Sequence, residues 1–161
     1  MMVTAVDTNI LLDVLGNDPL FFGKSSELVE RQRESGSLII SPIVYSELLA
    51  FFLSKHNSGQ ESSKLDEFLK DTGVIVFDFT KEDFILSALV WRKFPNDKQI
   101  ACPKCGALND FSCKECNSKV LWRNHLLTDF LIGAHAQNHA SLLLTRDRGY
   151  YKKYFTVKIL P

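Results

Sequence analysis

The stretch that decides the fold is residues 3–15, which read V-T-A-V-D-T-N-I-L-L-D-V-L. A short apolar run over residues 3–6 ends at Asp7, and this pattern predicts a buried strand. Thr8 and Asn9 are residue types that often cap a helix, and apolar residues then recur at helical spacing as far as Gly16. A strand that passes directly into a helix predicts the first unit of an α/β fold.

The same alternation continues along the chain. Four further apolar runs predict strands at residues 38–40, 74–79, 141–145 and 157–160. Helical patterns lie between them, at residues 23–35, 43–53, 65–69, 84–91, 124–138 and 150–154. Ser41-Pro42 and the pair Thr80 and Asp83 are typical of helix N-termini. Strands that alternate with helices predict a parallel sheet with helices on both faces.

Composition excludes several classes of protein. The 161 residues are 45% hydrophobic and 24% charged, which excludes a disordered chain, a collagen and a coiled coil. Nineteen basic residues balance nineteen acidic ones, but residues 1–90 hold seven Lys/Arg against fourteen Asp/Glu, and residues 91–161 hold twelve against five. This asymmetry fits a basic region that binds a polyanion, and it equally fits charge scattered over a solvated surface.

The apolar stretches and the cysteines indicate where in the cell the protein is expected. The apolar run before Asp7 is too short for a secretory signal, and the longest uncharged stretch, Phe130–Thr145, has only 16 residues and several polar ones. All four cysteines lie within residues 102–116, a clustering typical of metal ligands in a reducing compartment rather than of disulfides. We therefore expect a cytoplasmic protein with no membrane segment.

Four acidic residues are the candidate catalytic groups: Asp7, Glu47, Asp129 and Asp147. Asp7 and Asp147 follow predicted strands, whereas Glu47 and Asp129 lie in the early turns of helices beside strands. Because ligands bind beyond the carboxyl ends of parallel strands, all four can converge at one edge of the sheet. Clustered carboxylates repel one another, so such a site favours Mg²⁺ or Mn²⁺. The alternative is that Asp7 and Asp147 only cap helices.

These motifs together resemble a PIN-domain nuclease of the bacterial and archaeal VapC-like branch. They are Asp7-Thr8-Asn9, Glu47 after Ser41-Pro42, residues 129–134 (D-F-L-I-G-A) and residues 144–151 (L-T-R-D-R-G-Y-Y). The resemblance covers nearly the whole chain outside residues 96–121. It implies a PIN-like parallel sheet and four acids that hold Mg²⁺ or Mn²⁺ for cleavage of single-stranded RNA, with Thr145 or Asn9 supporting them. It further implies a toxin that an antitoxin neutralises, often as a homodimer.

The cysteine segment predicts a second metal site. Cys102 with Cys105 and Cys113 with Cys116 form two C-x-x-C pairs separated by seven residues. Gly106 and Asn117 follow them, and both residue types tolerate the left-handed backbone that such turns need. Four thiolates at this spacing suit tetrahedral Zn²⁺ in a structural site; a redox pair is the alternative. We expect residues 96–121 to form a zinc ribbon whose folding depends on the metal, inserted in a PIN-like domain of residues 1–95 and 122–161.

The sequence thus predicts an Mg²⁺- or Mn²⁺-dependent endoribonuclease that hydrolyses RNA phosphodiester bonds with no covalent enzyme intermediate. Basic residues surround the ribbon, with Trp91 and Trp122 at its ends, an arrangement that suits binding of RNA. The other interpretation is that both tryptophans are core residues. His135 and His139 are expected to be packing or surface residues. Two other functions stay open: a ribosomal RNA processing enzyme, and a catalytically idle PIN scaffold that binds RNA or protein.

Overall fold

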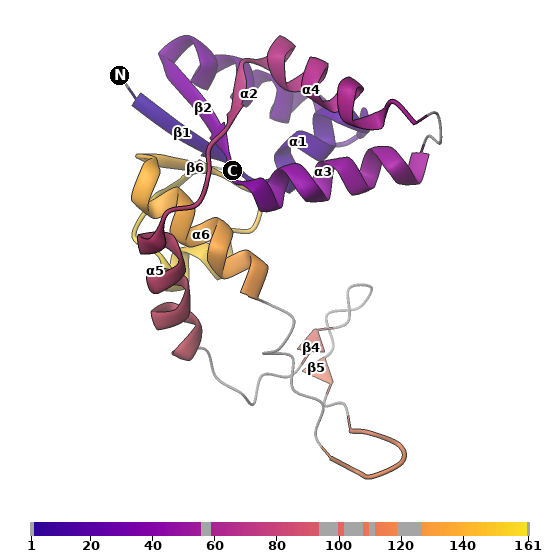
Figure 1. Ribbon diagram of the computed structural model, residues 1–161, viewed down its shortest axis with the longest axis vertical. Coiled ribbons are helices and arrows are strands. Elements are labelled where there is room, and N and C mark those ends of the chain that lie inside the picture. Colours follow the sequence, from indigo (N-terminus) through magenta and orange to yellow (C-terminus); the bar gives the residue numbers. More distant parts are fainter. Residues whose placement is uncertain are drawn as a thin grey trace.

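The computed structural model describes residues 2–55, 59–93, 100–101, 108–109, 112–118 and 127–160. Its main sheet has five parallel strands in the order β3-β2-β1-β6-β7 (Figure 1). Their bounds are β1 Met2–Val6, β2 Gly36–Ile40, β3 Val74–Val76, β6 Leu142–Leu144 and β7 Lys158–Leu160. The expected α/β class with a parallel sheet is confirmed.

Helices cover both faces of this sheet. They are α1 Thr8–Leu15, α2 Phe22–Ser35, α3 Pro42–Lys55, α4 Glu61–Thr72, α5 Lys81–Arg92, α6 Leu127–His139 and α7 Arg148–Tyr154. The strand order runs outward from β1 to β3 and then returns to β6 on the other side of β1. Because such crossovers are right-handed, α1–α4 pack on one face and α5–α7 on the other. Within the described residues, none of these helices is long and apolar enough to cross a membrane.

The strands next to the centre of the sheet are buried on both faces. All three residues of β6 are buried, as are the last three of β1 and of β2. This explains why these strands read as continuous apolar runs rather than alternating ones. From the α6 side, Phe130 is fully buried, and Gly133 lies so close to the Phe155 ring that a Cβ there would stand 2.2 Å from a ring carbon. The core thus holds α6 tightly against α7.

Most local signals place the elements as expected, but Thr8 and Asn9, the expected caps, are the first two residues of α1. Asp7 caps α1, Gly16 ends it, and the Ser41 hydroxyl accepts the Val44 N–H at 3.4 Å beside Pro42. The predicted strand over residues 74–79 is shorter in the structure, where β3 ends at Val76. Its partner β2 ends at Ile40, so only one more ladder bond forms, from the Phe77 N–H to the Ile40 carbonyl at 2.9 Å.

A buried acid joins α5 to α6. Asp83, which is fully buried, accepts hydrogen bonds from the Thr80 N–H at 2.8 Å, from the Asn138 amide at 2.7 Å and from His139 Nε2 at 2.9 Å. His135 is also buried, and its Nε2 lies 2.8 Å from the Phe77 carbonyl. Both histidines pack between helices and the segment after β3, in agreement with the expectation from sequence. The helices α5 and α6 run antiparallel, and these hydrogen bonds of Asp83 tie the N-terminus of α5 to the C-terminus of α6.

The cysteine segment is described in part. A two-stranded antiparallel sheet joins β4 Ile100–Ala101 to β5 Leu108–Asn109. Residues 113–118 form a tight turn, in which the Cys113 N–H donates to the Ser118 carbonyl at 2.8 Å and Asn117 adopts φ +56°. Asn117 therefore takes the left-handed conformation expected of it. Cys102, Cys105, Gly106 and Trp122 lie outside the described residues, as do the predicted domain boundaries at 95/96 and 121/122.

We expect Asp83→Asn to destabilise the protein at neutral pH and to reduce its acid sensitivity. Burial raises the pKa of Asp83, but hydrogen bonds from Thr80, Asn138 and His139 outweigh it, so the pKa is lowered overall. A lowered pKa stabilises the fold above the unfolded value near 4 and ceases to do so as pH falls through the folded value. The free energy of unfolding should fall by about 3 kcal/mol in the variant at pH 7.

Urea unfolding at pH 7 and pH 3 measures this difference, with Asp66→Asn on exposed α4 as the matched control. The difference in the free energy of unfolding between wild type and Asp83→Asn should be smaller at pH 3 than at pH 7. The Asp66→Asn variant should unfold as wild type does at both pH values. An equal gap at the two pH values would contradict a charged Asp83 in the folded protein.

Candidate functional site

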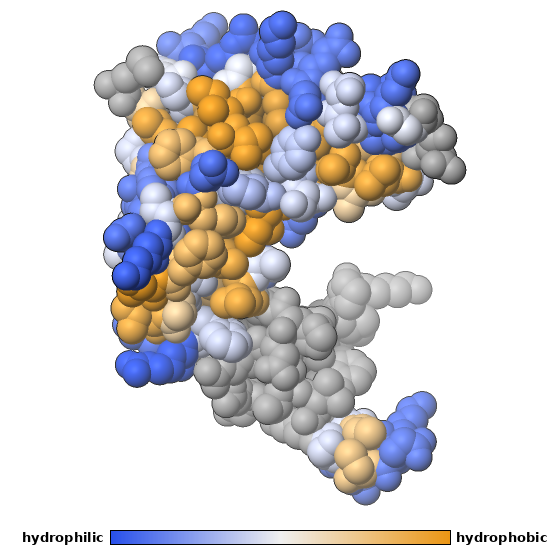
Figure 2. Space-filling model, in the orientation of Figure 1, coloured by the Kyte–Doolittle hydropathy of each residue, from blue (hydrophilic) through white to orange (hydrophobic). Residues whose placement is uncertain are grey.

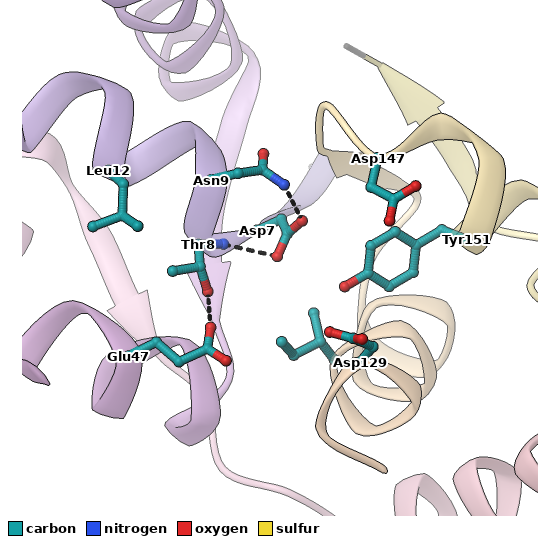
Figure 3. Close-up of a pocket in the computed structure, with 9 residues that line it drawn as sticks. Asp7, Thr8, Asn9, Leu12, Glu47, Asp129, Asp147 and Tyr151 are labelled. Carbon is teal, nitrogen blue, oxygen red and sulfur yellow. Dashed lines mark hydrogen bonds between the residues drawn. The ribbon is translucent and has the colours of Figure 1, made fainter. Parts of the chain in front are cut away.

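A pocket of about 250 Å³ opens at the carboxyl ends of β1 and β6. These two strands are neighbours in the sheet, and the chain order reverses between them. Such a switch point is where ligands bind in open α/β sheets, because the helices that follow the two strands diverge to opposite faces. The residues that line the pocket are Asp7, Thr8, Asn9, Leu12, Glu47, Asp129, Ile132, Asp147 and Tyr151 (Figure 3).

All four predicted acids line this one pocket, and each comes from a different element. Asp7 stands between β1 and α1, and Glu47 lies in the second turn of α3. Asp129 lies in the first turn of α6, and Asp147 in the loop between β6 and α7. Asp7 is buried and Asp129 half-buried, whereas Glu47 and Asp147 are exposed. Figure 3 shows Glu47 across the pocket from Asp129, with Asp7 and Asp147 between and above them.

Hydrogen bonds hold Asp7 in a single orientation. Its Oδ1 accepts the Thr8 N–H at 2.8 Å, and its Oδ2 accepts from Asn9 Nδ2 at 2.6 Å and from the Thr145 hydroxyl at 2.7 Å. The Thr145 Oγ1 in turn accepts the Asp147 N–H at 3.0 Å. Asn9 and Thr145, the two predicted supporting residues, therefore both contact the buried acid, and Thr145 also joins it to the loop of the fourth acid.

Two further pocket residues orient or border the acids. The Thr8 hydroxyl donates to Glu47 Oε2, which fixes the exposed acid of α3 against the first turn of α1. Tyr151 projects into the pocket between Asp147 and Asp129 (Figure 3), while its ring is buried against α6 and Phe155. One wall of the pocket is thus formed by an aromatic side chain.

Burial and, secondly, the proximity of the other acids raise the pKa values of Asp7 and Asp129. The pKa of Asp7 is raised to about 6, mainly by burial and also by the charges of Glu47 and Asp147, although hydrogen bonds from Thr145 and Thr8 lower it. Burial also raises the pKa of Asp129 to about 6, and the charges of Asp7, Glu47 and Asp147 add to the effect. Negative charge is therefore destabilised in this pocket, which is the electrostatic setting of a cation site.

The donor set fits a hard divalent cation. All four acids offer carboxylate oxygens, the ligand type that Mg²⁺ and Mn²⁺ prefer, and a positive ion would relieve the repulsion that raises the two pKa values. Among the described residues, no three His, Cys, Asp or Glu side chains lie close enough, as they stand, to bind one ion together. The acids instead surround the pocket from several sides.

Sequence reasoning missed Thr8, Leu12, Ile132 and Tyr151. Thr8 and Leu12 are four residues apart on α1 and share the face that lines the pocket, as the helical period requires. Tyr151 stands four residues after Asp147 and lies on the helix that follows it. The spacing was present in the sequence, but only the packing of α1 against α3 and of α7 against α6 shows which face turns toward the acids.

Solved structures similar to this chain come from bacterial VapBC and toxin–antitoxin complexes. VapBC2 from Rickettsia felis, bound to promoter DNA, matches with a TM-score of 0.65 at 19% identity over 99% of this chain and 98% of that one. VapBC-1 from nontypeable Haemophilus influenzae matches with 0.61 at 15%, over 99% and 97%. A toxin–antitoxin complex from Klebsiella pneumoniae matches with 0.59 at 16%, over 98% and 96%. The TM-scores establish a shared fold.

A family model gives the assignment that structural similarity at such low identity does not. No curated protein matches the chain. The model described as "PIN domain" matches residues 4–156, which runs from the middle of β1 to the residues just before β7 and includes all four acids. This chain belongs to the PIN-domain family.

Proposed function

We propose that the protein is a divalent-metal-dependent endoribonuclease whose catalytic residues are Asp7, Glu47, Asp129 and Asp147. Membership of the PIN-domain family supports a nuclease. The observation that carries the proposal is the convergence of four acids from four elements on one pocket at the switch point of the sheet. A purely structural role does not explain this cluster of acids. The raised pKa values of Asp7 and Asp129 show that their charged forms are less favourable in the pocket than in water, which is typical of functional sites.

The residues of the chain have separate tasks in this reaction. The four acids would hold Mg²⁺ or Mn²⁺, and when bound such ions activate water and stabilise charge on the phosphate during hydrolysis. Asn9 and Thr145 donate to Asp7 Oδ2 and keep that carboxylate turned to the pocket. Thr8 does the same for Glu47. Because these donors are already in place, the acids need little reorganisation when the substrate arrives.

The similar solved structures support a toxin of a toxin–antitoxin pair. Several are complexes of the VapBC type, and one is described as a toxin–antitoxin complex. We therefore propose an antitoxin protein as a partner, RNA as the substrate and the cytoplasm as the location. Ribosomal RNA processing remains the second candidate, since a PIN domain with a zinc ribbon suits either task.

We also propose a homodimer, on the basis of exposed apolar side chains. At the β3 edge of the sheet and along α5, large apolar residues are 40% to 56% exposed; they are Ile75, Val76, Phe77, Phe84, Ile85 and Leu89. Figure 2 shows apolar surface over this side of the molecule. An exposed strand edge with apolar neighbours commonly pairs with another chain. A second copy of this chain is the occupant we propose, as in other members of the family.

The cysteine segment supports a structural zinc site, with Cys102, Cys105, Cys113 and Cys116 as its ligands. Within the described part, the Cys116 Sγ lies 2.9 Å from the Ser118 hydroxyl, and this bond, with contacts from Ser118 and Cys113, lowers the pKa of the exposed Cys116 thiol. A lower pKa favours the thiolate, which is the form that binds metal. We propose that the segment positions the RNA or a partner, while the acids cleave.

We expect Asp129→Asn to abolish RNA cleavage, because it removes a carboxylate from the pocket without changing side-chain volume. Denaturing gels of a labelled single-stranded RNA, with Mg²⁺ or Mn²⁺ at saturation, measure the loss. Asp7→Asn should have the same effect, and Asp66→Asn, whose amide oxygen can still accept from Tyr45, should cleave as wild type does. Wild-type rates in both pocket variants would contradict the proposed catalytic site.

The same Asp129→Asn variant should be more stable than wild type at pH 8. Because the folded pKa of about 6 lies above the unfolded value, folding is favoured most at low pH and weakened as pH rises through 6. After allowance for its partial exposure, relief of this cost should be about 1 kcal/mol. For a chain of this size that is a Tm increase of about 2–4 °C. Thermal unfolding in EDTA should show the increase at pH 8 and none at pH 4.

Replacing Cys113 and Cys116 with Ser should release one Zn²⁺ per chain and leave the main sheet folded. Elemental analysis measures the zinc content of protein purified without chelators, and circular dichroism reports the sheet and helices. Cleavage of a short unstructured RNA should persist, while preference among RNA targets falls. Ser112→Ala, directly before the same turn, serves as a control that keeps all four thiols. Wild-type protein without zinc would refute the proposed metal site.

A further inference from the structure

Asp13 is a buried acid outside the pocket. It is 2% exposed and does not belong to the residues that line the acidic pocket. Both of its carboxylate oxygens are bonded: Oδ1 to the Arg146 guanidinium at 2.9 Å, and Oδ2 to the Ser25 hydroxyl at 2.7 Å. A buried carboxylate destabilises a fold unless it is paired and hydrogen-bonded. The completeness of this pairing indicates that Asp13 holds Arg146 in a fixed position.

Arg146 lies along one face of α1. Its backbone N–H donates to Asn9 Oδ1 at 3.1 Å, while its guanidinium reaches Asp13. Asn9 and Asp13 are four residues apart, so they stand one above the other on the helix. The guanidinium carbon also lies 4.3 Å from the centre of the Phe21 ring. Arg146 is therefore tied to α1 at two points and covered by an aromatic ring.

The contact with Asn9 determines what Asn9 offers to the pocket. Because Asn9 Oδ1 accepts from Arg146, its Nδ2 faces Asp7 Oδ2 and Thr145 Oγ1, at 2.6 Å and 3.2 Å. With the amide reversed, an oxygen would face the Asp7 carboxylate and repel it. The residue after Arg146 is Asp147, the acid that enters the pocket from this loop. Arg146 thus precedes Asp147 in the chain and is bonded to Asn9, whose amide orients Asp7.

We propose that Arg146 and Asp13 form a clamp that fixes the loop after β6 to α1 and so positions Asn9 and Asp147 for cation binding. Both are positioning residues, because neither lines the pocket. The inference rests on the proposed function for its consequence in catalysis, but the clamp itself is a property of the metal-free protein. The alternative is that Arg146, whose side chain is 39% exposed, binds RNA phosphates directly.

Backbone amide exchange in metal-free protein tests the clamp without reference to activity. The Arg146 and Asp147 amides bond to Asn9 and Thr145, and the buried Leu143 amide in β6 reports global unfolding. Arg146→Gln and Asp13→Asn should each accelerate exchange at Arg146 and Asp147 by about tenfold, with Leu143 unchanged. The double variant should accelerate exchange no more than either single variant does, because each single substitution already removes the pair of Arg146 and Asp13. Equal acceleration at Leu143, or none at Asp147, would overturn the proposal.

Mn²⁺ calorimetry and RNA cleavage then test its consequence. Both clamp variants should bind Mn²⁺ about tenfold more weakly and lose kcat with little change in KM. Lys152→Gln, which removes one exposed positive charge on α7, is the matched control and should keep the wild-type Kd for Mn²⁺. If Arg146→Gln and Lys152→Gln both raise only KM, Arg146 is a phosphate contact and the clamp is refuted.

These readouts separate failure of the clamp from failure of the proposed function. Wild-type protein that binds Mn²⁺ and shows the expected exchange pattern, but cleaves no RNA, would refute the ribonuclease and leave the clamp standing. Should Asp13→Asn fail to fold, Arg146→Lys carries the test. This variant keeps a positive charge beside Asp13 but loses the planar contact with Phe21. Its effect on amide exchange and on Mn²⁺ affinity should therefore be smaller than that of Arg146→Gln.

Discussion

The parallel pairing of β1 with β6 is the constraint on which the rest of the site depends. It joins strands from opposite ends of the chain, with Val6 beside Leu144, and it continues one step further through the Asp7 N–H, which donates to the Leu144 carbonyl at 2.9 Å. That last bond places Asp7 beside Thr145, and the hydroxyl of Thr145 then serves both Asp7 and Asp147. A shift of this register by one residue would turn Thr145 to the other face of the sheet.

Two buried acids at this junction, one in α1 and one at its cap, have different partners. Asp7 is buried beside other acids and has a raised pKa, whereas Asp13 is buried beside an arginine that neutralises it. Both lie at the same end of the sheet, but only the first faces the pocket. The difference comes from the helical period, since residues 9 and 13 share one face of α1 and residues 8 and 12 share another. One short helix thus contributes Thr8, Asn9 and Leu12 to the pocket and Asp13 to its support.

Much of this arrangement was predictable from the order of elements. Asp7, Glu47, Asp129 and Asp147 follow or adjoin strands, and parallel strands bring such positions to a common edge, as the pocket confirms. The contacts of Thr8 with Glu47 and of Arg146 with Asp13 were not predictable, because they depend on side-chain directions across pairs of elements that are 39 and 133 residues apart. The end of β3 at Val76 likewise depends on where its partner stops. Asn117 was predictable, since its left-handed backbone is a local property of the turn.

The tie between Asp83 and His139 also governs how freely the middle of the chain can vary in length. It joins the start of α5 to the end of α6, so the open ends of this antiparallel pair are Arg92 and Leu127, where the cysteine segment leaves and returns (Figure 1). Because the tie keeps the two helices together, lengthening the segment between Arg92 and Leu127 costs only loop-closure entropy. This cost is about 0.6 kcal/mol for each doubling of the segment's length. A segment can therefore be gained, lost or exchanged at this point in evolution while the acids of the pocket keep their positions.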